Sequence, residues 1–129
     1  MPAQRPSLTP EQLRIKISDL EKKVAFLELN PNDSHAWNDL GIMYRQNKQP
    51  AEAVAAFDKA IEIEPRSEEP RYRKATVLMQ DLNDPEGAIK AWEELLKVNP
   101  SAMLGNGQSL TGMIERMKKL KKESKEPKT

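Results

Sequence analysis

The sequence lacks cysteine altogether and contains one histidine among its 129 residues. A disulfide framework and a cysteine-based metal site are therefore excluded, and His35 has no second ligand at helical spacing beside it. The sequence also shows no combination of a nucleophile, a base and an orienting group at positions that would form a catalytic site. We predict that the protein is not an enzyme, has no catalytic residue, holds no metal, and needs no cofactor or small-molecule substrate.

Long apolar runs are also missing. No stretch approaches the length needed to cross a bilayer, and the first ten residues lack the apolar centre of a secretory signal peptide. We expect a cytoplasmic protein from the sequence as written. A periplasmic or membrane-anchored location is the alternative if an N-terminal anchor was trimmed.

Apolar and aromatic residues are few, whereas charged residues are many. Hydrophobic residues make up 37% of the chain, aromatic residues 5% and charged residues 32%. A solenoid, in which each helix buries one face against its neighbours, suits such a polar single domain better than one large core. The net charge is +1, but from residue 116 onward seven Lys or Arg face two Glu, which leaves this tail at +5 and residues 1–115 at −4.

A spaced pattern of eight residues runs from Ser34 to Pro65. Its members are Trp37, Leu40, Gly41, Tyr44, Ala53, Phe57, Ala60 and Pro65. Trp37 and Tyr44 lie on one face of a first helix, and Gly41 between them lets a second helix approach closely. Pro65 ends the pair, because proline cannot continue a helix. The spacing resembles the tetratricopeptide repeat.

A weaker copy of the pattern follows 35 residues later. It consists of Tyr72, Ala88, Trp92, Leu95 and Pro100. Two positions depart from the family pattern, since Thr76 replaces the glycine and Met79 replaces the second aromatic residue. We predict repeats at 34–67 and 69–100. The resemblance implies an all-α solenoid of antiparallel helix pairs, a right-handed superhelix of about six helices.

Flanking helices complete the expected domain. Residues 1–8 are predicted as a flexible tail and residues 9–30 as a packing helix that Thr9 caps, with an apolar stripe at Leu13, Ile17, Leu20, Val24 and Leu27. The stripe predicts packing on the first repeat, and a homodimeric coiled coil is the alternative. A loop at 101–108, a capping helix at 109–122 and a disordered basic tail at 123–129 follow.

In the family that the repeats resemble, the first helix of each pair lines a concave groove. Carrying those positions over gives a predicted peptide-binding groove of His35, Asn38, Ile42, Arg45, Gln46, Arg73, Lys74, Val77 and Gln80. This groove is polar and cationic over an apolar floor of Ile42 and Val77. Its amides and cations can bind a peptide backbone, an acidic side chain or a terminal carboxylate. The alternative for Arg73 and Lys74 is an ordinary solvated helix face.

A second, looser resemblance concerns residues 88–96 together with the helix segment 20–29. These look like the tetratricopeptide modules of bacterial cytochrome c maturation factors, which bind the C-terminal ends of client proteins. The resemblance favours a bacterial origin and binding of a peptide end.

We therefore predict a non-catalytic interaction module or scaffold that binds a peptide segment or the C-terminus of a partner protein, acidic segments included. Two alternatives stay open: a self-associating assembly protein, and binding of nucleic acid or an anionic surface through the basic tail. We do not expect nucleic acid as the main partner, because repeat packing accounts for five of the six aromatic residues. A monomer or weak homodimer is expected.

Overall fold

The computed structural model describes residues 8–104 and 107–125, and within them it contains six helices. Their bounds are α1 Pro10–Leu29, α2 Ser34–Gln46, α3 Pro50–Ile63, α4 Glu69–Gln80, α5 Pro85–Val98 and α6 Leu110–Lys125. The described residues form no strand, only an isolated bridge between Met103 and Ser109. None of the described helices is long and apolar enough to cross a membrane.

Capping side chains explain where three of the helices begin. The Thr9 hydroxyl accepts from the Gln12 backbone N–H at 3.1 Å, and the Gln12 side chain accepts from the Thr9 N–H at 3.0 Å, which is the predicted capping box. Asp33 caps α2 by accepting from the Ala36 N–H at 3.0 Å. Asp84 caps α5 in the same way. Each cap satisfies an N–H that the helix itself leaves unpaired.

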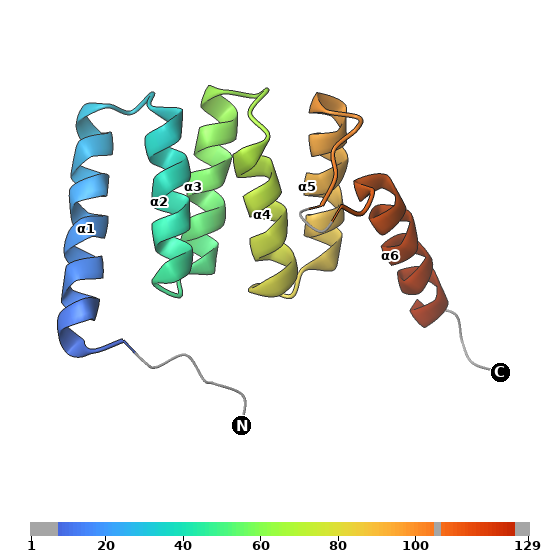
Figure 1. Cartoon of the computed structure of the whole chain (residues 1–129), viewed down its shortest axis with the longest axis horizontal. Coiled ribbons are helices and arrows are strands. Elements are labelled where there is room, and N and C mark those ends of the chain that lie inside the picture. Colours follow the sequence, from blue (N-terminus) through green and yellow to red (C-terminus); the bar gives the residue numbers. More distant parts are fainter. Residues whose placement is uncertain (1–7, 105–106, 126–129) are drawn as a thin grey trace.

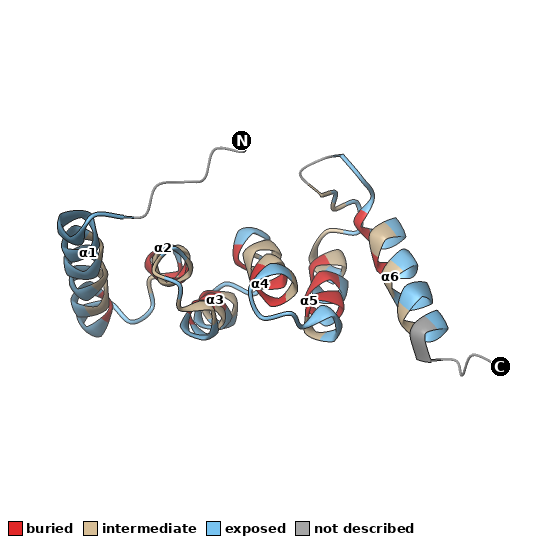
Figure 2. Cartoon of the chain, turned by 90° about the horizontal axis from the view of Figure 1, so that it is seen from below, coloured by how far each residue is buried: buried red, intermediate tan, exposed pale blue. Residues whose placement is uncertain are grey.

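The helices stand side by side in chain order from α1 to α6 (Figure 1). Seen from below, α2 and α4 lie in one layer while α3 and α5 lie in the other, and the buried residues face the neighbouring helices (Figure 2). The core follows this row as three clusters rather than one. The first joins α1, α2 and α3, the second joins α3 to α4, and the third joins α4, α5 and α6. This serial core is the expected organisation of a solenoid.

Gly41 sets how closely α2 approaches α3. A Cβ built at this position would overlap the Phe57 ring, with Cδ1 only 2.6 Å away. The ring is 1% exposed. The close approach predicted for Gly41 is therefore present, because glycine is the residue that leaves room for the aromatic ring against the helix backbone.

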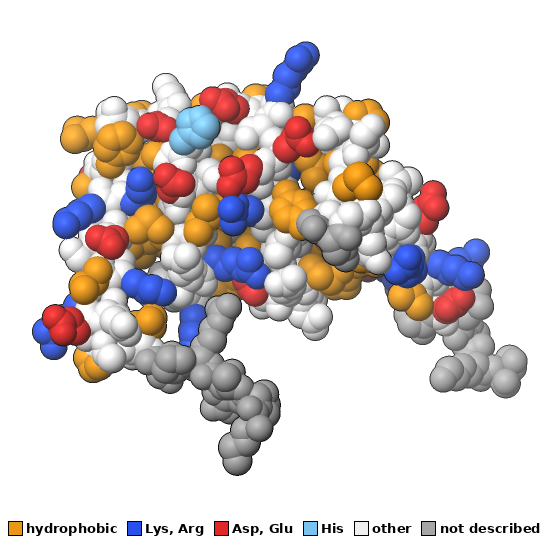
Figure 3. All heavy atoms as spheres, in the orientation of Figure 1, with side chains coloured by type: hydrophobic (Ala, Val, Ile, Leu, Met, Phe, Trp, Pro, Cys, Tyr) orange, Lys and Arg blue, Asp and Glu red, His pale blue; other side chains and the backbone are white. Residues whose placement is uncertain are grey.

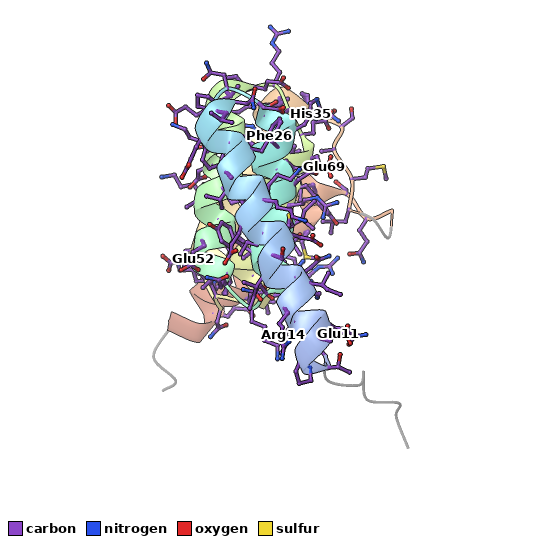
Figure 4. The ribbon with its side chains drawn as sticks, turned by 90° about the vertical axis from the view of Figure 1, so that its left-hand side faces the viewer. Glu11, Arg14, Phe26, His35, Glu52 and Glu69 are labelled. Atoms are coloured by element: carbon purple, nitrogen blue, oxygen red, sulfur yellow. The ribbon has the colours of Figure 1, made fainter. Side chains whose placement is uncertain are left out.

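The apolar stripe of α1 is only partly covered. Leu20, Val24 and Leu27 pack on the cluster that contains Ala36 and Leu40. Leu13 and Ile17 remain 40% and 45% exposed, because α1 has 20 residues whereas α2 has 13. Figure 4 views the row from this end, with α1 in front and Glu11 and Arg14 at the end of the helix remote from Phe26.

The end of α6 differs from the sequence-based expectation. The helix continues to Lys125, so residues 123–125 belong to it and not to a disordered tail. Within the part predicted as helix, α6 is paired with α5, since Lys118 pairs with Glu93 at 3.4 Å and Lys121 pairs with Glu86. Residues 1–7 of the tail predicted at 1–8, and residues 126–129 of the tail predicted at 123–129, lie outside the described residues.

Candidate functional site

The predicted groove positions lie mainly on α2 and α4, the two helices that share one layer. We call the exposed surface of these two helices the α2/α4 face. Figure 3 shows His35 in pale blue near the upper edge of the molecule, with acidic and basic side chains below it. His35, Gln46 and Gln80 are exposed, whereas Ile42 is half-buried against the cluster of Phe57 and Val77. The face is therefore polar with one apolar contact below it.

Arg45 ties α2 to the end of α4. Its Nε donates to Asp81 Oδ2 at 2.7 Å, and its Nη2 donates to Gln80 Oε1 at 3.0 Å. The side chains of Arg45 and Asp81 are 34% and 29% exposed. The structure thus brings Arg45 and Gln80 together, but the guanidinium is also bonded to Asp81, a carboxylate that the sequence analysis did not single out.

A second polar group gathers around Glu69 at the start of α4. Arg73 donates from Nε to Glu69 Oε1 at 2.9 Å. This bond is the main cause that lowers the pKa of the Glu69 carboxyl from its ordinary 4.5; a hydrogen bond from Asn38 and the nearby charges of Arg73 and His35 add to it, while burial opposes it. Glu69 therefore stays ionised at neutral pH. It links Asn38 and Arg73, two predicted groove residues from different repeats.

Asn38 is more enclosed than a groove residue needs to be. It is 8% exposed, and its Oδ1 is buried without a hydrogen-bond partner among the described residues. Its amide is directed to Glu69. Asn38 thus positions a carboxylate of the face more than it presents itself to a ligand.

Two positions differ from the expectation. Val77 is 0% exposed and packs with Ala53 and Phe57 in the core, so its side chain forms no groove floor. Lys74 pairs with Asp58 of α3 at 2.6 Å and lines a small hollow between α3, α4 and α5. A family position identifies a place on a helix, but the rotation of α4 against α3 decides which neighbours its side chain meets.

Two hollows lie along α4 and meet at Tyr72. One, of about 390 Å³, is bordered by Glu68 and Glu69 together with Asn99 and Met103. The other, of about 350 Å³, is lined largely by apolar groups from α4, α5, α6 and the segment before α6, namely Tyr72, Thr76, Met79, Trp92, Leu104, Met113 and Met117, with Gln80 at its edge. We call the two hollows together the α4 trough, with an acidic end and an apolar end.

The departures of the second repeat from the family pattern border this trough. Thr76 stands where the first repeat has Gly41, and Met79 stands where it has Tyr44. In the first repeat the Phe57 ring fills the space over Gly41. In the second, Thr76 and Met79 line a hollow beside Trp92. Sequence analysis treated these two residues as weak repeat positions, and their departure from the pattern is the signal that could have marked the trough.

The described residues offer no grouping of three or more His, Asp or Glu side chains suited to a metal ion. The residues of α6 that made the C-terminus basic are partly paired, since Lys118 and Lys121 face Glu93 and Glu86 of α5. These pairs reduce the charge that α6 would present to an anionic surface.

Comparisons with known proteins agree with the repeat pattern. The tetratricopeptide repeat model matches residues 34–67, the same bounds that the sequence predicted. Over 112 residues the chain is 27% identical to the PEX5-related protein of Mus musculus and 26% identical to that of Rattus norvegicus. These matches cover 82% of this chain but only 20% and 18% of the relatives, so the chain spans about a fifth of their length.

The fold also matches a solved structure, the crystal structure of MamA. The TM-score is 0.68 at 19% identity, and the match covers 84% of this chain and 61% of MamA. At this identity the match shows the fold alone. The bacterial origin and the likeness to cytochrome c maturation factors stay predictions. The match to the repeat model, the row of helix pairs and the two relatives together support a tetratricopeptide-repeat protein with an all-α solenoid fold.

Proposed function

We propose that this chain binds a segment of a partner protein along the α2/α4 face and acts as a non-catalytic scaffold. The observation that carries the proposal is the α4 trough, whose two hollows of about 390 and 350 Å³ meet at Tyr72 beside the polar groups of the face. Binding sites are usually hollows lined by apolar groups, with a few polar groups that neighbouring residues fix in position. Peptide segments fit an elongated hollow, since they present a side chain every few ångströms.

The ionic contacts of the face bear on which segments can bind. Arg45 and Arg73 are paired with Asp81 and Glu69. An acidic side chain or a terminal carboxylate would have to displace one of these carboxylates before it could use the guanidinium. The acidic or C-terminal ligand that the sequence predicts therefore faces competition within the site.

A display selection of random peptides against the full chain tests the proposal. We expect enriched peptides whose affinity changes about tenfold in the double variant Arg45→Ala, Arg73→Ala, because loss of the two guanidinium groups leaves Asp81 and Glu69 unpaired and changes the charge of the face. The charge-matched control is Lys59→Ala, Lys90→Ala, which alters exposed residues of α3 and α5. Equal affinity of the wild type and the Arg45, Arg73 variant would place binding elsewhere, and a selection that enriches no peptide would refute the proposal.

Self-association is the second candidate, and the exposed stripe of α1 favours it. Leu13 and Ile17 of this stripe are 40% and 45% exposed at the open end of the row. A second copy that covered them would bury apolar surface. Sedimentation equilibrium of the wild type and of the variant Leu13→Glu, Ile17→Glu decides this, because a monomer mass in both would exclude it.

A further inference from the structure

The two ends of the α4 trough differ in chemistry. Glu68 and Glu69 border one end, and among the described residues that line either hollow there is no Lys or Arg. Glu69 does pair with Arg73 beside the trough, but Glu68 bonds only the neutral amide of Asn99 at 2.8 Å in the contacts described. The acidic end therefore keeps a net negative charge. A cationic side chain is the group that complements it.

The other end is apolar and adaptable. Met79, Met113 and Met117 line it, and Met103 borders the acidic end, so four of the six methionines of the chain lie along the trough. Methionine side chains are flexible and adjust to apolar groups of different shape. This end therefore fits a large aliphatic or aromatic side chain rather than one particular residue.

Trp92 adds an independent observation at the apolar end. The residue is 6% exposed, yet its indole Nε1 is buried without a hydrogen-bond partner among the described residues. A buried donor without an acceptor is unfavourable, because it loses its hydrogen bond to water and gains none in the protein. A peptide carbonyl that enters as a methionine side chain shifts would supply that acceptor.

The distance between the acidic end and the apolar end of the trough follows from their positions on α4. Glu69 and Thr76 are seven residues apart on the helix, which corresponds to about 10 Å at about 1.5 Å per residue. An extended peptide advances about 3.3 Å per residue and covers that distance in about three residues. The two matching side chains of a ligand would therefore be three or four residues apart.

We propose that the α4 trough binds an extended peptide segment in which a Lys or Arg lies three or four residues from a large apolar side chain. The inference rests on the proposed function and specifies its ligand. The proposed ligand is opposite in charge to the acidic ligand that the sequence predicts, because the carboxylates that line the trough outnumber the cations that line it.

An array of Gly-Ser octapeptides tests the spacing and the charge together. Two positions, one to six residues apart, are each varied through Lys, Arg, Glu, Leu, Phe and Ala and probed with the labelled full chain. We expect the strongest binding from Lys or Arg combined with Leu or Phe at a separation of three or four. Stronger binding of the Glu peptides, or equal binding at all separations, would overturn the inference.

Variants then place the binding in the trough. For the best basic peptide we expect Glu68→Gln and Met113→Gln each to weaken binding about tenfold, through loss of the charge and of the apolar contact. The controls are Glu62→Gln, an exposed carboxylate of α3, and Leu120→Gln, an exposed apolar residue of α6 that lines neither hollow. Unchanged affinity in both trough variants overturns the inference, whereas display-selected peptides that still depend on Arg45 and Arg73 would leave the proposed function standing. A selection that enriches no peptide refutes both.

Discussion

Replacement of Gly41 by alanine offers the sharpest test of the packing in the first repeat. The new Cβ would overlap the Phe57 ring, which is 1% exposed and has no free space to move into. Overpacking of a core costs about 1–3 kcal/mol, and the gain in helix propensity returns about 1 kcal/mol. Because three ring atoms lie in the path of one methyl group, we expect a cost near the upper limit and a net destabilisation of about 2 kcal/mol.

Thermal unfolding followed by circular dichroism at 222 nm measures this effect. A net loss of about 2 kcal/mol corresponds to a fall of about 8 °C in Tm for a domain of this size. Gly112→Ala is the matched control, since Gly112 lies on the exposed side of α6 with its nearest neighbouring atom 3.9 Å from the new Cβ. That variant should be unchanged or more stable, by up to about 1 kcal/mol. A Gly41→Ala variant that melts at or above the wild-type temperature would refute the packing argument.

A double mutant assigns the cost to the ring. In a Phe57→Leu background the ring is absent, so the penalty of Gly41→Ala should shrink by at least about 1 kcal/mol. Additive effects of the two substitutions would show that the cost of Gly41→Ala comes from another source.

Three further changes test local features. Asp33→Ala should destabilise the chain by about 1 kcal/mol in urea titration, because the cap on the Ala36 N–H is lost; no change in midpoint would contradict this role. Glu69→Gln should lower stability at pH 7 by less than about 1 kcal/mol. Because the folded pKa of Glu69 lies below 4.5, this contribution is present above that pH and is lost as the pH falls further, so the two stability curves should converge in acid. A difference that persists in acid would exclude the ionic origin. For Arg45→Ala and Asp81→Asn, a double-mutant cycle should give a coupling of up to about 1 kcal/mol, and zero coupling would show that the pair does not hold α2 to α4.

Local sequence features predict the helices and their order well. The Thr9 cap depends on residues within one turn, and the pattern from Trp37 to Pro65 depends on residues within a single helix pair. The bounds 34–67 coincide with the family match for the same reason. The predicted end of the last helix, at residue 122, was less accurate, since the helix continues to Lys125.

The candidate site was only partly predictable. Side chains from α2 and α4 do share one face, and Arg45 does meet Gln80. The carboxylates that neutralise its cations were not identified, since Asp81 is 36 residues from Arg45 and its position depends on how α4 docks. Val77 and Lys74 were assigned to the face by register, but contacts with α3 turn them elsewhere.

The sequence by itself determined the repeat framework of this protein. It specifies which residues are small enough for close helix approach, where most helices begin and end, and which repeat positions face the core. Those properties depend on side-chain size and spacing within about 34 residues. Only the tertiary structure decided the chemistry of the face, because ion pairing and burial arise between helices. In the folded chain Arg45 is paired with Asp81, and Val77 is buried. The α4 trough lies where Thr76 and Met79 depart from the repeat pattern.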